Sequence, residues 1–426
     1  MKVRLVLIAL FVASASLSQT NQYLTWARCL ERAKARNPDL VAARAAVREL
    51  EYGVASASAG FLPQISASAS ANRGQREVAN NWFDTEGSGA DLSLSQDLFS
   101  GGGNIAARKR ALAQLDIGNE QYRETLSDVE LRTRLAFIDV LYAQDLVDLT
   151  ERIEERRGNN VRLIQLRFDG GRENAGSLAR SKAQYSQSHF EVREARRSLE
   201  YALRNLAAAM GSMDPAPGAA GDLNAGEPEE LVDLTGLMRQ TPTYGIATTQ
   251  VEASKQGLKV TRSARFPQID FRASAGVGDQ NADRWFAKYD ASWGVSLNAT
   301  MPIYTGNRLN SQVAAQKEKI IQSEMDLLDT ANTLLATLKQ RWNLFTDAVE
   351  NEAVQKELYD AELLRAEIST AKYKQGLLSY EDWDIIESNL INQGKTHLQR
   401  RRTSEIEQAR WKNALGWSVW HTEQGE

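Results

Sequence analysis

The sequence predicts an α+β fold in which one structural unit occurs twice. Three observations support this prediction. Four motifs return with an offset of 204 or 205 residues, as from Leu62 to Phe266 and from Leu98 to Ile303. Four short segments alternate apolar and polar residues, and two segments of about 65 residues have a helical pattern without proline. Self-similarity at a fixed offset indicates a repeat architecture.

The repeat divides the 426 residues into parts. Motif Leu62-Pro63-Gln64-Ile65 returns as Phe266-Pro267-Gln268-Ile269, and Leu98-Phe99-Ser100-Gly101 returns as Ile303-Tyr304-Thr305-Gly306. We expect a signal peptide at 1–18, a first repeat at 19–211 (helix, two strands, long helix, helix), a Pro- and Gly-rich linker at 212–230, a second repeat at 231–416 and a tail at 417–426.

Composition argues against several classes of protein. The chain has 51 Lys+Arg against 55 Asp+Glu, a net charge of -4, which does not favour nucleic acid. With one cysteine and three scattered histidines we expect no disulfide, no metal site and no cofactor. Gly101-Gly102-Gly103 lacks the Lys-Ser/Thr of a phosphate loop, and no catalytic arrangement stands out, so we expect no enzymatic activity.

The N-terminus has the pattern of a secretory signal. Basic Met1-Lys2-Val3-Arg4 precedes the apolar run 5–12, and small residues follow as cleavage candidates. Cys29 follows no small-residue box, so a lipid anchor is disfavoured and a thiol on a helix face is expected. No other stretch approaches the length of an apolar transmembrane helix, so a membrane role would have to use strands.

The alternating segments are 65–71, 90–95, 269–277 and 292–299. Strands of about ten residues with one apolar face match the transmembrane β-barrel pattern, although an ordinary half-buried hairpin would read the same way. The loops between them carry paired aromatics, which fit a membrane interface, unless they pack on each other. These are Trp82, Phe83, Trp285 and Phe286.

Helical segments flank each strand pair. A helix is expected over about 23–57, interrupted at Asn37-Pro38, with a similar break at Thr241-Pro242. Long helices are expected from the glycine turns after the strands, at Gly101, Gly102 and Gly306, to about 168 and 373, which is roughly 95–100 Å each. Turns at 170–171 and 375–376 then lead into helices of about 35 residues.

Four strands cannot close a barrel, and an open edge in lipid leaves backbone groups unsatisfied. Two chains would give eight strands and a filled interior, and three would give twelve and begin to leave a lumen. The polar face is made of small residues, which favours a wet channel.

The chain closely resembles the TolC-like outer membrane efflux proteins over nearly its whole mature length. The resemblance rests on the tips Phe168-Asp169-Gly170-Gly171 and Tyr373-Lys374-Gln375-Gly376-Leu377-Leu378-Ser379-Tyr380, on Pro302-Ile303-Tyr304-Thr305-Gly306 and on Ala414-Leu415-Gly416-Trp417. It implies a homotrimer in the outer membrane of a Gram-negative-type bacterium, in which a twelve-stranded transmembrane β-barrel continues into a long periplasmic α-helical barrel.

The resemblance also implies a function, which is that of a passive gated duct in a tripartite efflux or type I secretion system. The duct would contact outer membrane lipid and dock onto a periplasmic adaptor and an inner membrane pump of the resistance-nodulation-division or ABC type. The docking tips would be Phe168, Gly170, Gly171, Gly376, Leu377 and Ser379. The resemblance does not identify the cargo.

In the family, acidic residues after the second tip glycine surround the closed periplasmic end. Asp382 matches, while Ile385 does not, although Asp384 is adjacent and Glu381 is near. The alternative is favourable charge at a helix N-terminus. Tyr373 matches a position that ties hairpins together, but Ser177 stands where its acidic partner would be. An alternative function, a soluble periplasmic coiled-coil adaptor or structural protein, would lack the four strands and would contain the hairpin once.

Overall fold

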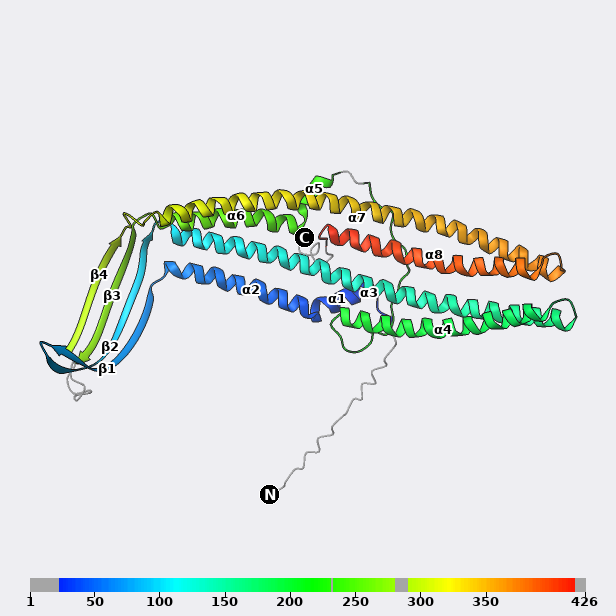
Figure 1. Cartoon of the computed structure of the whole chain (residues 1–426), viewed down its shortest axis with the longest axis horizontal. Coiled ribbons are helices and arrows are strands. Elements are labelled where there is room, and N and C mark those ends of the chain that lie inside the picture. The colour runs from blue at the N-terminus through cyan, green and yellow to red at the C-terminus, as the bar shows by residue number, and fades with distance from the viewer. Residues whose placement is uncertain (1–22, 231–232, 280–289, 418–426) are drawn as a thin grey trace, which may run out of the picture. The chain divides into compact units, whose positions relative to one another are not determined.

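The computed structural model describes residues 23–230, 233–279 and 290–417, so the predicted signal peptide and the aromatics Trp285 and Phe286 lie outside the described residues. Helices alternate with two pairs of strands in the order that the repeat predicts (Figure 1). The helices are α1 (Trp26–Arg36), α2 (Pro38–Ser58), α3 (Gly103–Asp169), α4 (Ala175–Ala209), α5 (Leu234–Gln240), α6 (Pro242–Ser263), α7 (Arg308–Gln375) and α8 (Tyr380–Ala414), with a short 3-10 turn at Ala59–Phe61.

The strands form one antiparallel sheet in sequence order, β1 (Gln64–Val78), β2 (Asn81–Ser100), β3 (Gln268–Asp279) and β4 (Asp290–Thr300) (Figure 1). The pairing of β2 with β3 joins the two repeats. The register places the apolar residues of all four strands in common rows, since Leu92 lies opposite Ala275 and Ala275 lies opposite Trp293. Small polar residues form the other rows, as in Ser66 opposite Ser93. The predicted two-faced sheet is confirmed.

The first hairpin is longer than the alternation predicts. Strands β1 and β2 have 15 and 20 residues, and they meet at a two-residue turn where Ala79 and Asn80 have φ of 52° and 64°. Positive φ at both central residues defines a tight turn whose twist suits a hairpin. The prediction that residues 81–84 form a loop is therefore wrong. Trp82 lies inside β2 opposite Glu77, because the pairing continues to the turn.

Proline defines the helix starts that the sequence indicated. The side chain of Asn37 accepts a hydrogen bond from the Asp39 amide (2.9 Å), and that of Thr241 accepts one from the Tyr244 amide (3.3 Å). Each residue precedes a proline at the first helical position, where the missing amide hydrogen costs nothing. The expected breaks therefore separate α1 from α2 and α5 from α6.

The chain divides into two compact units. One, called here the tip unit, contains Arg132–Asn224, Glu352–Glu405 and the N-terminal segment to Arg36. The sheet unit contains Asn37–Leu131, Ala225–Asn351 and the segment from Ile406. In the tip unit the end of α3 and α4 form one helical hairpin, and the end of α7 and the start of α8 form the other. None of the described helices is both long and apolar enough to cross a membrane.

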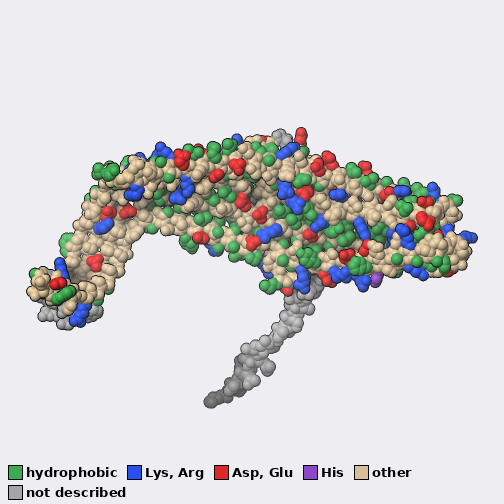
Figure 2. All heavy atoms as spheres, in the orientation of Figure 1, with side chains coloured by type: hydrophobic (Ala, Val, Ile, Leu, Met, Phe, Trp, Pro, Cys, Tyr) green, Lys and Arg blue, Asp and Glu red, His purple; other side chains and the backbone are tan. Residues whose placement is uncertain are grey.

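The linker packs as an ordered strap within the tip unit. Leu24 donates its amide hydrogen to the Gly218 carbonyl and accepts one from Ala220, both at 2.9 Å. The Gln144 amide holds the backbone of Ala219 from the other side at 2.9 and 3.1 Å. Leu223 is buried. Along the helices, charged side chains of both signs are interspersed on the visible face (Figure 2), as expected for solvated flanks.

Candidate functional site at the helical hairpin tips

The first helical hairpin, formed by α3 and α4, turns at a glycine in the left-handed conformation. Gly171 has φ of 68°, and its amide donates to the Phe168 carbonyl at 2.9 Å. The Arg172 amide donates to the Arg167 carbonyl at 2.8 Å. This pair of bonds is a Schellman motif, which satisfies the last carbonyls of a helix. The side chain of Asn174 then caps α4.

The second hairpin repeats this geometry. Gly376 has φ of 79°, its amide donates to the Tyr373 carbonyl at 3.0 Å, and the Leu377 amide donates to the Lys372 carbonyl at 2.9 Å. The hydroxyl of Ser379 accepts a hydrogen bond from the backbone amide of Asp382, in the first turn of α8, at 3.1 Å. Gly171 and Gly376 therefore stand where the backbone requires positive φ, while Gly170, predicted with them, does not have a positive φ.

We expect Gly376→Ala to destabilise the chain by about 1–2 kcal/mol, because an L-residue pays this cost in the left-handed conformation. No atom lies within 4 Å of a Cβ built there, so the effect comes from the backbone alone. Gly53→Ala is the matched control, since Gly53 lies inside α2 with equally open space and Ala is the better helix former there. Thermal unfolding of both variants tests this, and equal midpoints would contradict it.

Buried aromatic rings join the two hairpins beneath the turns. The cluster consists of Ile164 and Leu178 from the first hairpin and Tyr373, Tyr380 and Trp383 from the second. The rings of Tyr373 and Trp383 stack at 4.4 Å with an interplanar angle of 6°. We call these five residues the tip cluster, and their contacts hold the ends of the hairpins together.

Tyr373 also makes polar contacts with the first hairpin. Its hydroxyl donates to Glu173 Oε2 at 2.8 Å, and Arg167 Nη1 donates to its carbonyl at 2.8 Å. The Arg167 guanidinium lies 4.5 Å from the centre of the Tyr373 ring. Burial, reinforced by Glu173, raises the pKa of Tyr373. The hydroxyl therefore remains a donor at neutral pH, with Glu173 as its partner in place of Ser177.

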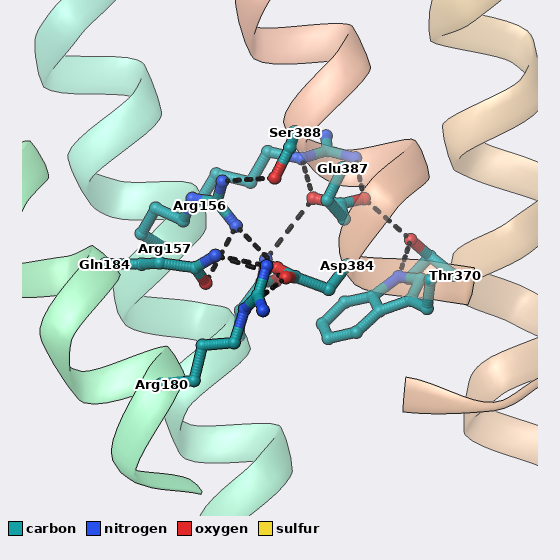
Figure 3. A network of polar contacts seen from close by, with 10 residues as sticks. Arg156, Arg157, Arg180, Gln184, Thr370, Asp384, Glu387 and Ser388 are labelled. Carbon is teal, nitrogen blue, oxygen red and sulfur yellow. Dashed lines mark hydrogen bonds and ion pairs between the residues drawn. The ribbon is translucent and has the colours of Figure 1, made fainter. Parts of the chain in front are cut away.

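A buried ion-pair network lies next to the tip cluster (Figure 3). Arg156 binds Glu387 through two hydrogen bonds of 2.6 Å, and this interaction raises the pKa of Arg156. Asp384 accepts from Arg180 Nε at 2.9 Å and from Arg157 Nη1 at 3.4 Å. We call these five residues the hairpin network, which consists of Arg156, Arg157, Arg180, Asp384 and Glu387.

The network places its carboxylates out of solvent. Asp384 is 3% exposed and Glu387 is 1% exposed. Gln184 adds a hydrogen bond of 3.0 Å to Asp384, and Thr370 adds one of 3.2 Å to Glu387. All three arginines belong to the first hairpin and both carboxylates to the second. The two hairpins of one chain are therefore joined by charge as well as by rings.

The three acidic residues predicted for the gate separate into two kinds. Asp384 is buried and faces the arginines of its own chain. Glu381 and Asp382 are exposed in the first turn of α8, and Asp382 Oδ2 accepts from the Ser379 hydroxyl at 2.8 Å. The sequence reasoning missed Glu387 and the arginines. Only the three-residue spacing from Asp384 to Glu387, which places both on one helix face, could have indicated Glu387.

The turn glycines and the sheet aromatics complete the list of predicted residues. Gly101, Gly102 and Gly306 have φ of 59°, 80° and 60°, as a strand-to-helix turn requires. Trp82 is 66% exposed, and its partner in the sheet is Glu77. Glu77 follows Ala71, the last residue of the apolar row in β1, by six residues, so Trp82 lies about 20 Å along the β-hairpin from the apolar face. The side chain of Phe83 is not among those described.

The apolar face ends in other aromatic residues that the loop-based reasoning missed. Trp293 is 82% exposed and lies near the start of β4, opposite Ala275. Exposed aromatics also stand where the strands meet the helices, and these are Phe61, Phe99, Phe266 and Tyr304. Aromatics at both ends of an apolar band are typical of membrane interfaces.

Comparison with known proteins identifies the family. The model of the family described as "Outer membrane efflux protein" matches residues 29–212 and 242–417. The chain is 26% identical over 341 residues to the outer membrane efflux protein BepC of Brucella suis, covering 77% of this chain and 70% of that one. It is 23% identical over 421 residues to the outer membrane protein TolC of Escherichia coli, covering 94% and 83%.

Solved structures share the fold at low identity. The structure of CusC has a TM-score of 0.82 at 16% identity and covers 92% of both chains. The outer membrane protein VceC of Vibrio cholerae has a TM-score of 0.78 at 18% identity, covering 92% of this chain and 96% of that one. The fold is thus the α+β fold of these channels, and the chain belongs to the outer membrane efflux protein family, which places it in the outer membrane with a large periplasmic part.

Proposed function

We propose that three copies of this chain form a passive, gated duct of a tripartite efflux or secretion system. The support for assembly is the sheet. Its edges, β1 and β4, have no partner strand among the described residues, and its outward rows are apolar. In lipid such edges must pair, and three copies give twelve strands around a face of small polar residues.

The observation that supports gating is the hairpin network. It joins the two hairpins of each chain near the tips, so separating them would leave the buried carboxylates of Asp384 and Glu387 without their arginine partners. Breaking a buried pair costs about 3–5 kcal/mol when one charge is left uncompensated. The closed duct is therefore stable by itself, and opening requires binding energy from partners.

The exposed first turn of α8 supplies the second part of the proposed gate. Glu381 and Asp382 face solvent in the single chain. Three copies of this pair would form a negative ring at the periplasmic end, which favours cations and slows anions. Asp384, which pairs with Arg157 and Arg180, contributes to the gate through the hairpin network instead.

The tips are the proposed docking surface for the adaptor. Leu377 is 71% exposed at the second turn, and Leu166 is 72% exposed near the first. Exposed leucines at turns otherwise rich in polar residues mark a site of protein contact.

The pump supplies the energy, and the duct supplies the path. A soluble coiled-coil adaptor is not favoured, because the family match covers both repeats. The predicted absence of enzymatic activity stays a prediction.

Site-specific crosslinking tests the docking proposal. A photo-crosslinking residue in place of Leu377 should give an adduct with a periplasmic adaptor in whole cells. The same residue in place of Met213, which is fully exposed in the linker, is the control. Identification of the adduct by mass spectrometry gives the adaptor and with it the class of pump. Equal adducts at both positions, or none at Leu377, would contradict docking through the tips.

A further inference from the structure

A cavity of about 330 Å³ lies in the sheet unit, between the start of α3 and the end of α6. Its lining includes Gly101 and Gly102 at the strand-to-helix turn, together with side chains from both helices. Three of these are cations, Lys109, Lys259 and Arg262. No acidic residue belongs to the lining.

The three cations lack carboxylate partners among the described residues, and all three are exposed. The cavity also adjoins the N-terminus of α3, a helix of 67 residues. A helix N-terminus presents unpaired amide hydrogens and a partial positive charge. Cationic side chains and a helix N-terminus at one cavity favour a phosphate group.

Gln256 supplies a further observation. Its side chain is part of the cavity wall and is only 4% exposed, yet its oxygen has no hydrogen-bond partner among the described residues. A buried amide oxygen without a donor is uncommon in folded proteins. This oxygen is closed to solvent, so a ligand that carries a hydroxyl or ammonium beside its phosphate would satisfy it once the Gln256 side chain rotates toward the cavity.

The position of the cavity favours a lipid as the source of the phosphate. It lies directly after Ser100, where β2 ends, so it stands at the edge of the apolar face of the sheet. Ile105 and Phe266, both in its lining, are 55% and 52% exposed. Apolar side chains beside cations at the end of a membrane strand are suited to a lipid whose tails lie along the sheet and whose headgroup enters the cavity.

We propose that this cavity binds the headgroup of an anionic phospholipid from the periplasmic leaflet of the outer membrane. Lys109, Lys259 and Arg262 bind the phosphate, Gln256 accepts a hydrogen bond from a headgroup hydroxyl, and Phe266 contacts the glycerol and the first carbons of the tails. The proposal is independent of docking and gating, and it requires only the outer membrane location.

Native mass spectrometry of the full, purified and delipidated chain tests this with dioleoylphosphatidylglycerol. The variant is Lys109→Gln/Lys259→Gln/Arg262→Gln. The matched control, Arg108→Gln/Arg110→Gln/Lys319→Gln, removes the same charge from exposed positions outside the lining. We expect binding to the variant to be about tenfold weaker or more, since each basic residue near anionic lipid contributes substantially to binding, and binding to the control to be unchanged.

Two results would overturn the proposal. Equal loss of binding in the variant and the control would mean that the lipid responds only to net charge. Inorganic phosphate that displaces the lipid at equal concentration would mean that the cavity selects free phosphate over a lipid headgroup. Dioleoylphosphatidylcholine, which offers no donor to Gln256 and has no net charge, should bind the unmodified chain more weakly than the glycerol lipid. Unchanged thermal unfolding shows that the variant remains folded.

Discussion

Asp384→Arg is expected to open the periplasmic end and raise single-channel conductance several-fold in planar bilayers. The substitution places a fourth cation beside Arg156, Arg157 and Arg180 and removes the buried anion that pairs with Arg157 and Arg180. A loss of about 4 kcal/mol shifts an equilibrium between closed and open states by about a thousandfold. Comparing the single-channel conductance of the variant with that of the unmodified protein measures this shift.

Two further variants separate gating from misfolding. Asp384→Asn keeps the size of the side chain and one hydrogen bond from Gln184, so it should produce a smaller rise. Arg180→Asp combined with Asp384→Arg restores one ion pair in reverse and should return part of the closed behaviour. An assembled protein with unchanged conductance in Asp384→Arg would show that the network does not hold the end closed.

Trp383→Ala is expected to remove about 3–5 kcal/mol of packing from the tips. Trp383 is 1% exposed, stacks on Tyr373, and donates its indole hydrogen to Thr370 Oγ1 at 3.0 Å. Because Thr370 in turn donates to Glu387, the loss extends to the hairpin network. Hydrogen exchange should increase at the start of α8 and at the end of α3.

Leu377→Ala is the control for this variant, because its side chain is exposed and lies outside the tip cluster. It should leave hydrogen exchange in α3 unchanged. If Trp383→Ala increases exchange only in its own helix, the cluster does not join the two hairpins and this part of the account is wrong.

The sequence predicts the elements of this fold well because each has a local physical cause. The alternation over 269–277 requires a two-faced strand, and the proline after Asn37 requires a helix start. Gly171 and Gly376 stand at turns because the Schellman motif needs positive φ. These causes act within a few residues and can be read without a structure.

The contacts between hairpins could not be read in this way. Arg156 and Glu387 are 231 residues apart, and which arginine meets which carboxylate depends on how four helix faces pack. Asp384 and Asp382 look alike in sequence, but the two-residue difference places Asp384 on the buried face of α8 and Asp382 on its exposed face. The sequence predicts a loop at Trp82, because no local signal shows that pairing continues to Val78 and Asn81.

Reversible crosslinking of the two helical hairpins tests whether their separation opens the duct. The Nζ atom of Lys395 on α8 lies 2.8 Å from Oε2 of Glu191 on α4. Cysteines that replace these two residues can therefore be joined by a short, reducible thiol crosslinker. The native Cys29 should not react, because burial raises its pKa to about 11.

The crosslink is placed in the Asp384→Arg chain, and the conductance of the same channels is recorded before and after reduction. We expect low conductance while the hairpins are joined and high conductance once the crosslinker is reduced. Conductance that is equally high in both states would contradict the claim that separation of these two hairpins opens the duct.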